Sequence, residues 1–411
     1  MSLPRIRIAP SAGHPDHIYD RANRAAADGD LERAEALYRQ LLGIRPGHAE
    51  GHNNLGNVLL AQGRCDDALA AFEMALGIGL DHPSVHYNRA SALKEAGRYD
   101  EAVRAFHRCL VRAPDYVMAY NNLANLHSGF GRWDSAVAGY RRSITLAPGW
   151  TRAQDNLRAT LQAMRAVGEG EAALRHALLW RRDHPDQPLA RHTAAALAGE
   201  AGDPRASDTY VKQLFDAFAG EFDTKLAAIG YRAPALLAEA VAAVVAPSAG
   251  LDVLDAGCGT GLCGPHLRPY ARSLTGVDLS AGMLDKAAAR GLYDRLEEAE
   301  LEAFARAHPG GFDLIVSADV LCYFGALDAI LPAFAAALRP GGRLAFTVER
   351  LAGGSAGGWA LMPHGRYAHE EPYVRATLEA SGFTAVTVGH GALRRECGED
   401  VTGLVVMAVR A

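Results

Sequence analysis

A run of apolar residues and glycines, Leu251 to Gly261, is the part of the chain most suited to chemistry. It reads as a short strand that enters a glycine turn, and Gly257, Gly259 and Gly261 would let the backbone approach a ligand where a Cβ atom would collide. Asp278 ends the next expected strand, 21 residues after Gly257 (278−257). An acid at that place can accept hydrogen bonds from both hydroxyls of a ribose. The spacing predicts a site for a cofactor that contains a nucleoside.

The glycine pattern alone leaves the cofactor open. Gly259 to Gly264 satisfies the G-x-G-x-x-G pattern of dinucleotide binders, which is a weak signal by itself. The string Asp255 to Gly261 (DAGCGTG) resembles motif I of class I S-adenosylmethionine-dependent methyltransferases. Later segments resemble that family in order and spacing over roughly residues 207 to 411. They are the fourth strand at Phe312–Asp319, the turn into the fifth at Leu338–Phe346, and the terminal antiparallel pair from Gly382 to Val409.

This resemblance implies a role for individual residues. Gly257, Gly259 and Gly261 are expected to line the methionyl part of the cofactor, and Asp255 to lie beneath it and favour its ammonium group. Asp278 is expected to hold the ribose. The remaining cofactor contacts are expected around the adenine and at the end of the fourth strand: Leu279, Met283, Glu300, Leu301 and Ala318. Glu300 stands where the family more often has Asp, and Met283 could equally be a core residue.

A capping segment is expected ahead of this core. Residues Leu214 to Asp223 resemble the family's helix that closes over the cofactor, and Gly230 to Pro234 follows it. Tyr210 or Arg232 would then contact the methionyl carboxylate.

Methyl transfer from a sulfonium is an in-line displacement, so the protein mainly supplies alignment, plus a base if the acceptor arrives protonated. Asp319 and Tyr323 follow the fourth strand, at the edge where open α/β sheets bind ligands. His369 is a candidate general base and Arg366 a candidate carboxylate anchor, both within the expected substrate cover. Each also has an ordinary structural explanation: a surface histidine, a solvated arginine or a packed tyrosine ring.

The first half of the chain repeats every 34 residues. The turn glycines Gly29, Gly63, Gly97 and Gly131 keep this period, and alanines and aromatic residues follow each glycine at fixed distances. The pattern resembles the tetratricopeptide repeat, in which two short helices per unit bury their apolar faces against the next unit.

Asparagines occupy one position of the first helix in successive units. Asn54, Asn88, Asn122 and Asn156 are each 34 residues apart (88−54 = 122−88 = 156−122). In this family that position lines the concave groove, and an amide can pair with both N–H and C=O of an extended chain. The sequence therefore predicts peptide binding; the alternative is that Asn is merely common there. The predicted peptide contacts are Asn53, Asn54, Asn57, Asn88, Asn121, Asn122, Asn125 and Asn156.

Composition narrows the function classes. With a net charge of −5 the chain offers no basic excess for nucleic acid or an anionic membrane surface. The apolar runs are too short for a membrane span, which takes roughly 18 residues, and the N-terminus lacks a secretory apolar region, so a cytoplasmic protein is expected. The six cysteines form no C-x-x-C pair, and we expect neither disulfides nor a metal site.

Two domains are therefore predicted. Residues 1–14 form a flexible N-terminus, and residues 15–204 an all-α solenoid of four clear repeats (15–150), a degenerate fifth (151–185) and one more helix. Residues 205–411 form a Rossmann-like α/β domain with a mostly parallel seven-stranded sheet and an antiparallel last strand. The predicted function is methylation of a peptide or protein held in the groove, using S-adenosylmethionine. The alternatives are a small-molecule acceptor, with repeats that serve oligomerisation or partner docking, and a scaffold with a vestigial catalytic domain; oligomeric state stays open.

Overall fold

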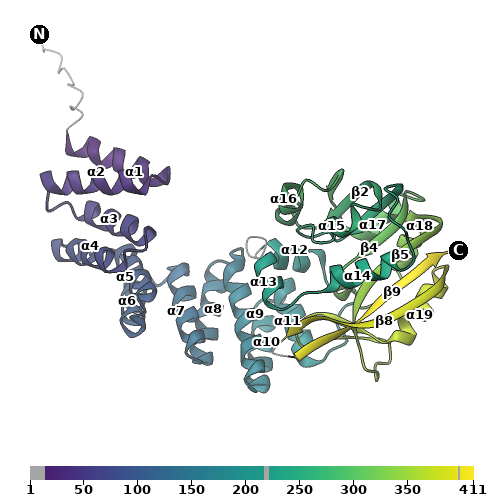
Figure 1. The fold of residues 1–411 in the computed structure, drawn as a ribbon. Helices are drawn as coiled ribbons and strands as arrows, with labels where there is room; N and C mark the ends of the chain where they lie inside the picture. Colours follow the sequence, from purple (N-terminus) through teal and green to yellow (C-terminus); the bar gives the residue numbers. More distant parts are fainter. Residues whose placement is uncertain (1–13, 217–221, 397–398) are drawn as a thin grey trace, which may run out of the picture. The chain divides into compact units, whose positions relative to one another are not determined.

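The computed structural model describes residues 14–216, 222–396 and 399–411, so nearly all of the expected flexible N-terminus lies outside the described residues. The chain divides into two compact units, residues 1–157 and 158–411. Figure 1 labels the helices and strands of both.

The first unit is an array of antiparallel helix pairs. The turns inside the pairs need a left-handed backbone, and glycine adopts it at Gly29, Gly63, Gly97 and Gly131, where φ lies between +66° and +79°. The helices are α1 (Pro15–Ala27), α2 (Leu31–Ile44), α3 (Ala49–Ala61), α4 (Cys65–Ile78), α5 (Pro83–Glu95), α6 (Tyr99–Arg112), α7 (Val117–Gly129), α8 (Trp133–Leu146) and the start of α9 (Thr151–Ala166).

Small and aromatic residues alternate in the core of this array. The alanines Ala34, Ala68, Ala102 and Ala136 are wholly buried where paired helices approach. The aromatic rings of the second helices, Tyr38, Phe72, Phe106 and Tyr140, are buried as well. Each pair thus covers the apolar face of its neighbour, which is the packing that the 34-residue period predicts.

The second unit begins inside α9 and includes two more helices, α10 (Gly170–Asp183) and α11 (Pro188–Ala198), ahead of the sheet. We predicted a boundary between residues 204 and 205. The division by compactness falls earlier because residues 158–204 pack with the α/β fold rather than with the preceding helices.

The sheet of the second unit has nine strands in the described residues, in the order β3-β2-β1-β4-β5-β7-β6, with β9 pairing β5 and β8 pairing β9. The first five strands are parallel, and β9 runs antiparallel to β5. The strands are β1 (Leu251–Ala256), β2 (Ala271–Asp278), β3 (Arg295–Glu298), β4 (Phe312–Ser317), β5 (Leu338–Arg350), β6 (Trp359–Leu361), β7 (Tyr367–His369), β8 (Phe383–Glu396) and β9 (Glu399–Arg410).

This topology confirms the predicted Rossmann-like class with an antiparallel last strand. The sheet is larger than the predicted seven strands because the β6–β7 hairpin adds two short ones beside the end of β5. Central strands are buried on both faces, with Val253, Leu254, Leu314 and Ile315 fully inaccessible. Parallel strands covered by helices need such continuous apolar runs.

Helices cover the sheet and connect its strands (Figure 1). They are α12 (Asp208–Asp216), α13 (Phe222–Ala228), α14 (Ala233–Ala242), α15 (Gly264–Leu267), α16 (Ala281–Ala289), α17 (Leu301–Ala307), α18 (Ile330–Ala337) and α19 (Glu371–Ala380). Within the described ranges, every helix is too short or too polar to cross a bilayer.

Candidate functional site

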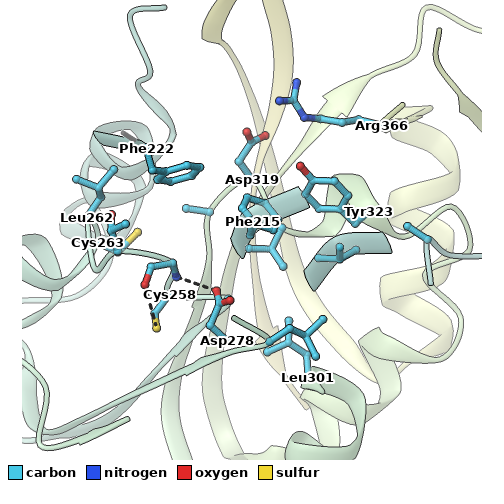
Figure 2. Close-up of a pocket in the computed structure, with 18 of the residues that line it drawn as sticks. Phe215, Phe222, Cys258, Leu262, Cys263, Asp278, Leu301, Asp319, Tyr323 and Arg366 are labelled. Atoms are coloured by element: carbon cyan, nitrogen blue, oxygen red, sulfur yellow. Dashed lines mark hydrogen bonds between the residues drawn. The ribbon is translucent and has the colours of Figure 1, made fainter. Parts of the chain in front are cut away.

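A pocket lies in the second unit at the carboxyl ends of β1, β2 and β4. It encloses about 1070 Å³ of empty space, part of it open to solvent. Figure 2 shows Asp278 and Leu301 at one end and Asp319, Tyr323 and Arg366 at the other, with Phe215 between them.

The glycine loop forms one wall. Gly257 and Gly259 line the pocket with φ of +76° and +53°. A Cβ atom on Gly257 would lie 2.4 Å from Cγ2 of Val320, so a larger residue does not fit. Gly261 also has a left-handed backbone, at φ +84°, but it packs beneath Tyr293 instead of lining the pocket.

Asp278 stands at the end of β2 against this loop. Its carboxylate accepts hydrogen bonds from the backbone N–H of Gly259 and of Ser280, both at 2.9 Å. Burial raises the pKa of Asp278, and those N–H groups oppose the shift. Two oxygens with spare lone pairs at the pocket surface suit a pair of ribose hydroxyls.

Leu279, Leu301 and Glu300, which the sequence analysis places around the adenine, line the same end of the pocket. Glu300 caps α17 by accepting from the N–H of Glu302 (3.0 Å) and Ala303 (2.7 Å). Burial raises its pKa, but the hydrogen bonds from Ala303, Glu302 and Arg205 outweigh this and leave the pKa lowered. The Glu300 carboxylate, which was expected among the adenine contacts, is therefore already engaged in hydrogen bonds within the protein.

Sequence reasoning missed Arg205. Its guanidinium donates to Glu300 at 2.6 Å and to Asp208 at 2.7 Å, and lies 5.7 Å from the ring centre of Phe324. The residue stands just before α12, outside every family motif, so its position followed from no pattern.

Helices α12 and α13 cover the glycine loop, in the place expected for the capping segment; its residues 217–221 lie outside the described residues. Phe215 and Phe222 line the pocket, and Leu226 joins them. Two hydrogen bonds of 2.5 Å fix these helices: Ser280 Oγ donates to Asp216, and Thr260 Oγ1 donates to Asp223. The recurring phenylalanines of this segment were the available signal.

The opposite end of the pocket carries the polar groups predicted for catalysis. Asp319 has a left-handed backbone (φ +57°), a strained conformation that often marks functional sites. Its N–H donates to Thr347 Oγ1 at 2.9 Å. Tyr323 packs edge-on to Phe215 with its ring centre 5.5 Å away, and burial raises its pKa. Arg366 and Ala318 complete this end.

A buried charge cluster supports Asp319. Nη1 of Arg394 lies 3.1 Å from both carboxylate oxygens of Asp319, and the same guanidinium pairs with Glu349 and Glu396. Burial disfavours the charged form of Glu349, but the hydrogen bond from His364 (3.1 Å) and the charge of Arg394 lower its pKa to about 2. Arg366 adds a second guanidinium, which pairs with Glu349 at 3.7 Å and with Glu396. Three carboxylates and two guanidiniums thus compensate one another.

Three predicted contacts lie away from the pocket lining. Asp255 is buried, and its carboxylate accepts from the hydroxyl of Tyr293 at 2.6 Å. Burial raises the pKa of Asp255 to about 7, opposed by that hydrogen bond. Met283 is a wholly buried core residue, and Arg232 is exposed at the start of α14. Tyr231, next to Arg232, lines the pocket instead.

Two further expectations are corrected. Tyr210 is buried outside the pocket lining, with its ring 4.1 Å from that of His192. His369, the candidate general base, is fully buried on β7, and its Nε2 bonds to the carbonyl of Gly325 at 3.0 Å. Burial lowers the pKa of His369 to about 4, which disfavours the protonated form. Neither Tyr210, predicted as a cofactor contact, nor His369, predicted as a base, lines the pocket.

In the repeat array, the four asparagines that recur every 34 residues, the ladder asparagines, form hydrogen bonds to the preceding repeat. Asn54, Asn88, Asn122 and Asn156 are half-buried. Each amide nitrogen donates to the side chain 35 residues earlier. The acceptors are Tyr19 (3.1 Å), Asn53 (3.2 Å), Tyr87 (2.9 Å) and Asn121 (2.9 Å), in that order.

The other predicted peptide contacts differ in exposure. Asn121 is buried, so the expectation that it faces a guest peptide is corrected. Asn53 is half-buried and donates to Asn54 at 3.1 Å. Asn57 and Asn125 are exposed, and Asn125 accepts from the hydroxyl of Tyr140 at 2.8 Å.

Among the described residues, no group of three or more His, Cys, Asp and Glu side chains is arranged to hold a metal ion.

Comparison with known proteins supports both halves. Residues 254–344 match the family model described as a methyltransferase domain, and residues 19–83 and 81–148 match two models of the tetratricopeptide repeat. A human protein named methyltransferase-like protein 27 is 39% identical over 106 residues, which is 25% of this chain and 43% of that protein.

A second relative and one solved structure are also similar to part of the chain. A ubiquinone biosynthesis O-methyltransferase from Thiobacillus denitrificans is 34% identical over 107 residues, covering 25% of this chain and 46% of that protein. The crystal structure titled a putative S-adenosylmethionine-dependent methyltransferase from Listeria monocytogenes is 20% identical over 43% of this chain and 99% of its own, with a TM-score of 0.35. The chain spans less than half the length of the first two relatives.

Proposed function

We propose that this chain, in which tetratricopeptide repeats precede a class I S-adenosylmethionine-dependent methyltransferase domain, methylates a peptide or protein that binds the repeats. The observation that carries the catalytic part is the half-buried carboxylate of Asp278 held against a glycine loop in one pocket. At the other end of that pocket stand Asp319, Tyr323 and Arg366.

The residues at the cofactor end fit the proposed group. The cradle at Gly257 is closed to any side chain, because a Cβ atom would collide with Val320. Asp278 would hold the ribose, and Leu279 and Leu301 would flank the adenine. S-adenosylmethionine supplies an activated methyl group when bound, so the chain has to bind, align and exclude water.

Asp319 is the residue best placed to orient the acceptor. Its side chain is 12% exposed, lines the pocket and is held by Arg394. Its carboxylate can accept a hydrogen bond from an O–H or N–H of the acceptor and take the proton that the nucleophile loses. Tyr323 and Arg366 would orient neighbouring groups of the same acceptor.

The repeats support the choice of a peptide. Asn88 and Asn156 each donate to the preceding repeat, and an amide has a second N–H and an oxygen to offer. Asn54 is more fully engaged, because it donates to Tyr19 and Asn23 and accepts from Asn53. Asn57 and Asn125 are exposed. The exposed amides of Asn57 and Asn125, with the remaining donors and acceptors of Asn88 and Asn156, suit the backbone of an extended chain.

Incubating the chain with labelled S-adenosylmethionine and a cell extract tests this proposal. We expect the chain to label a protein that mass spectrometry can identify, and the double change Asn57→Ala with Asn125→Ala to reduce the labelling several-fold. Thr145→Ala, a small exposed polar residue on α8, is the matched control. Equal labelling by all three forms would remove the groove from the proposal, whereas S-adenosylmethionine affinity should be the same in each.

A small-molecule acceptor is the second candidate. The acceptor end is bordered by buried charges, and the chain resembles a relative named for ubiquinone biosynthesis. In that case the label would appear in the small-molecule fraction of the extract and not in protein.

A further inference from the structure

Two of the segments that form the acceptor end are hydrogen-bonded to residues that precede the α/β fold. The first is the β6–β7 hairpin, whose tight turn is closed by Gly365 N–H to Met362 O and Met362 N–H to Arg366 O, both at 2.8 Å. Gly365 has φ +90°, a conformation that side chains disfavour. The next residue, Arg366, reaches into the pocket (Figure 2).

Helices α11 and α9 hold this turn. Nε2 of His192 on α11 donates to the carbonyl of Gly365 at 2.8 Å, and the imidazole stacks on Tyr210 at 4.1 Å. Burial lowers the pKa of His192, and the hydrogen bond to Gly365 opposes that shift. Nε2 of Gln162 on α9 donates to the carbonyl of Pro363, also at 2.8 Å.

The second segment, residues 323–326, carries Tyr323. The carbonyl of Pro204 accepts from the N–H of Gly325 (2.8 Å) and of Ala326 (2.7 Å), and Ala206 N–H donates to Tyr323 O at 2.8 Å. The hydroxyl of Tyr367 donates back to the carbonyl of Asp203 at 2.7 Å. Residues 204–206 therefore pair with the backbone of residues 323–326 beside the acceptor end, much as an added strand would.

From these contacts we infer that His192 is a positioning residue for the acceptor end of the pocket, with Gln162 and residues 203–206 as its supports. It acts through the Gly365 carbonyl, which fixes the turn that directs Arg366. Helices α9 and α11 thus support the acceptor wall from behind, without lining the pocket themselves. The inference rests on the proposed function in calling this end the acceptor end, but the hydrogen-exchange test does not depend on that function.

The test compares three forms of the full chain by hydrogen exchange of residues 359–369. His192→Phe keeps a ring on Tyr210 and removes the donor; His192→Gln keeps a donor of similar reach and removes the ring. We expect exchange about five-fold faster in the Phe form, the usual effect of one lost hydrogen bond, with most of the protection restored by Gln. His266→Phe, at an exposed histidine of α15, should leave this segment unchanged.

Calorimetry with S-adenosylmethionine and labelling of a cell extract complete the test. We expect the three forms to bind the cofactor equally, while the Phe form labels the extract several-fold more slowly and the Gln form recovers. If the Phe form does not fold, Gln162→Met removes the neighbouring donor and should loosen the same segment.

Unchanged exchange in 359–369, or no recovery with Gln, would overturn the inference. A wild-type chain that labels nothing would instead defeat the proposed function, and the exchange result would still decide the role of His192.

Discussion

The two ends of the pocket are built in different ways. At the cofactor end, Gly257, Asp278 and Leu301 lie within one 45-residue stretch, at or just after the ends of successive strands. Their contacts are backbone N–H groups and apolar side chains. At the acceptor end, Asp319 is paired with Arg394, 75 residues later on an antiparallel strand.

The difference lies in how charge is compensated. Asp278 is stabilised by backbone dipoles in a conformation that the loop fixes locally. Asp319 and Glu349 depend on the guanidinium of Arg394, which is wholly buried. Damage to the first arrangement should reduce ligand affinity, whereas damage to the second should reduce folding stability.

The largest expected effect follows from removing the shared cation. Arg394→Met leaves Asp319, Glu349 and Glu396 without it, and breaking a buried pair costs about 3–5 kcal/mol of unfolding free energy. Urea titration measures this loss. The neighbouring Arg395→Met removes a guanidinium that is 65% exposed, 3.6 Å from Asp400, and should cost about 1 kcal/mol or less. Equal losses would mean that the cluster does not support the acceptor end.

The second prediction uses pH, again at the acceptor side. His369 has a pKa of about 4 when folded because it is buried, against about 6.5 when unfolded. Between these values the unfolded chain binds a proton that the folded chain does not, so stability should fall by up to about 3 kcal/mol as pH drops from 6.5 to 4.

His369→Gln should remove most of that slope, and His266→Gln, on the surface, should keep it. The contributions of Glu349 and Glu396, whose pKa values are lowered to about 2, are lost only below pH 4.5. Those two carboxylates are therefore silent between pH 6.5 and 5. His192, with its lowered pKa, and Asp255, with a pKa of about 7, still contribute there, with opposite signs and equally in both variants. The difference between the two slopes is therefore the contribution of His369. Thermal unfolding across that interval would contradict the assignment if both variants behaved alike.

The same contrast explains what the sequence could predict. The glycine loop and Asp278 could be predicted because strand ends and turns are local features that spacing reveals, and Leu301 was predicted from the family resemblance. Gly257, Gly259, Asp278 and Leu301 all line the pocket. Tyr210, Arg232 and His369 were assigned to the pocket from their place in the order of motifs, but their side-chain directions depend on the packing of α11, α14 and the β6–β7 hairpin. No local pattern encodes those directions.

In the repeat array, too, the positions of residues could be predicted from the sequence but their side-chain partners could not. The 34-residue register of the asparagines was evident from the sequence, and so were the alanine and glycine positions. The acceptors at 35 residues, alternately tyrosine and asparagine, were not, because they depend on how one repeat stacks on the next. The amides that suggested a guest peptide also connect the repeats.

The third prediction examines the cofactor end. Asp278→Ala should weaken S-adenosylmethionine binding roughly 100-fold, about 3 kcal/mol, because two charge-assisted hydrogen bonds to the ribose disappear. Asp285→Ala, on the exposed face of α16, is the control. Isothermal titration gives both dissociation constants. An unaffected titration for Asp278→Ala would mean that the ribose is held elsewhere.

The smallest effect is expected at Glu300, whose carboxylate is held both by backbone N–H groups and by a guanidinium. It belongs to the cofactor end, yet its carboxylate is engaged by Arg205 and by two backbone N–H groups. Glu300→Gln keeps an oxygen for the cap and loses the charge, so S-adenosylmethionine affinity should fall only about five-fold, near 1 kcal/mol. Glu302→Gln, two residues further along the chain and outside the pocket lining, should leave the S-adenosylmethionine affinity unchanged. A loss as large as that of Asp278→Ala would show that Glu300 exchanges its partners for the adenine amine, and that this end of the pocket rearranges when the cofactor binds.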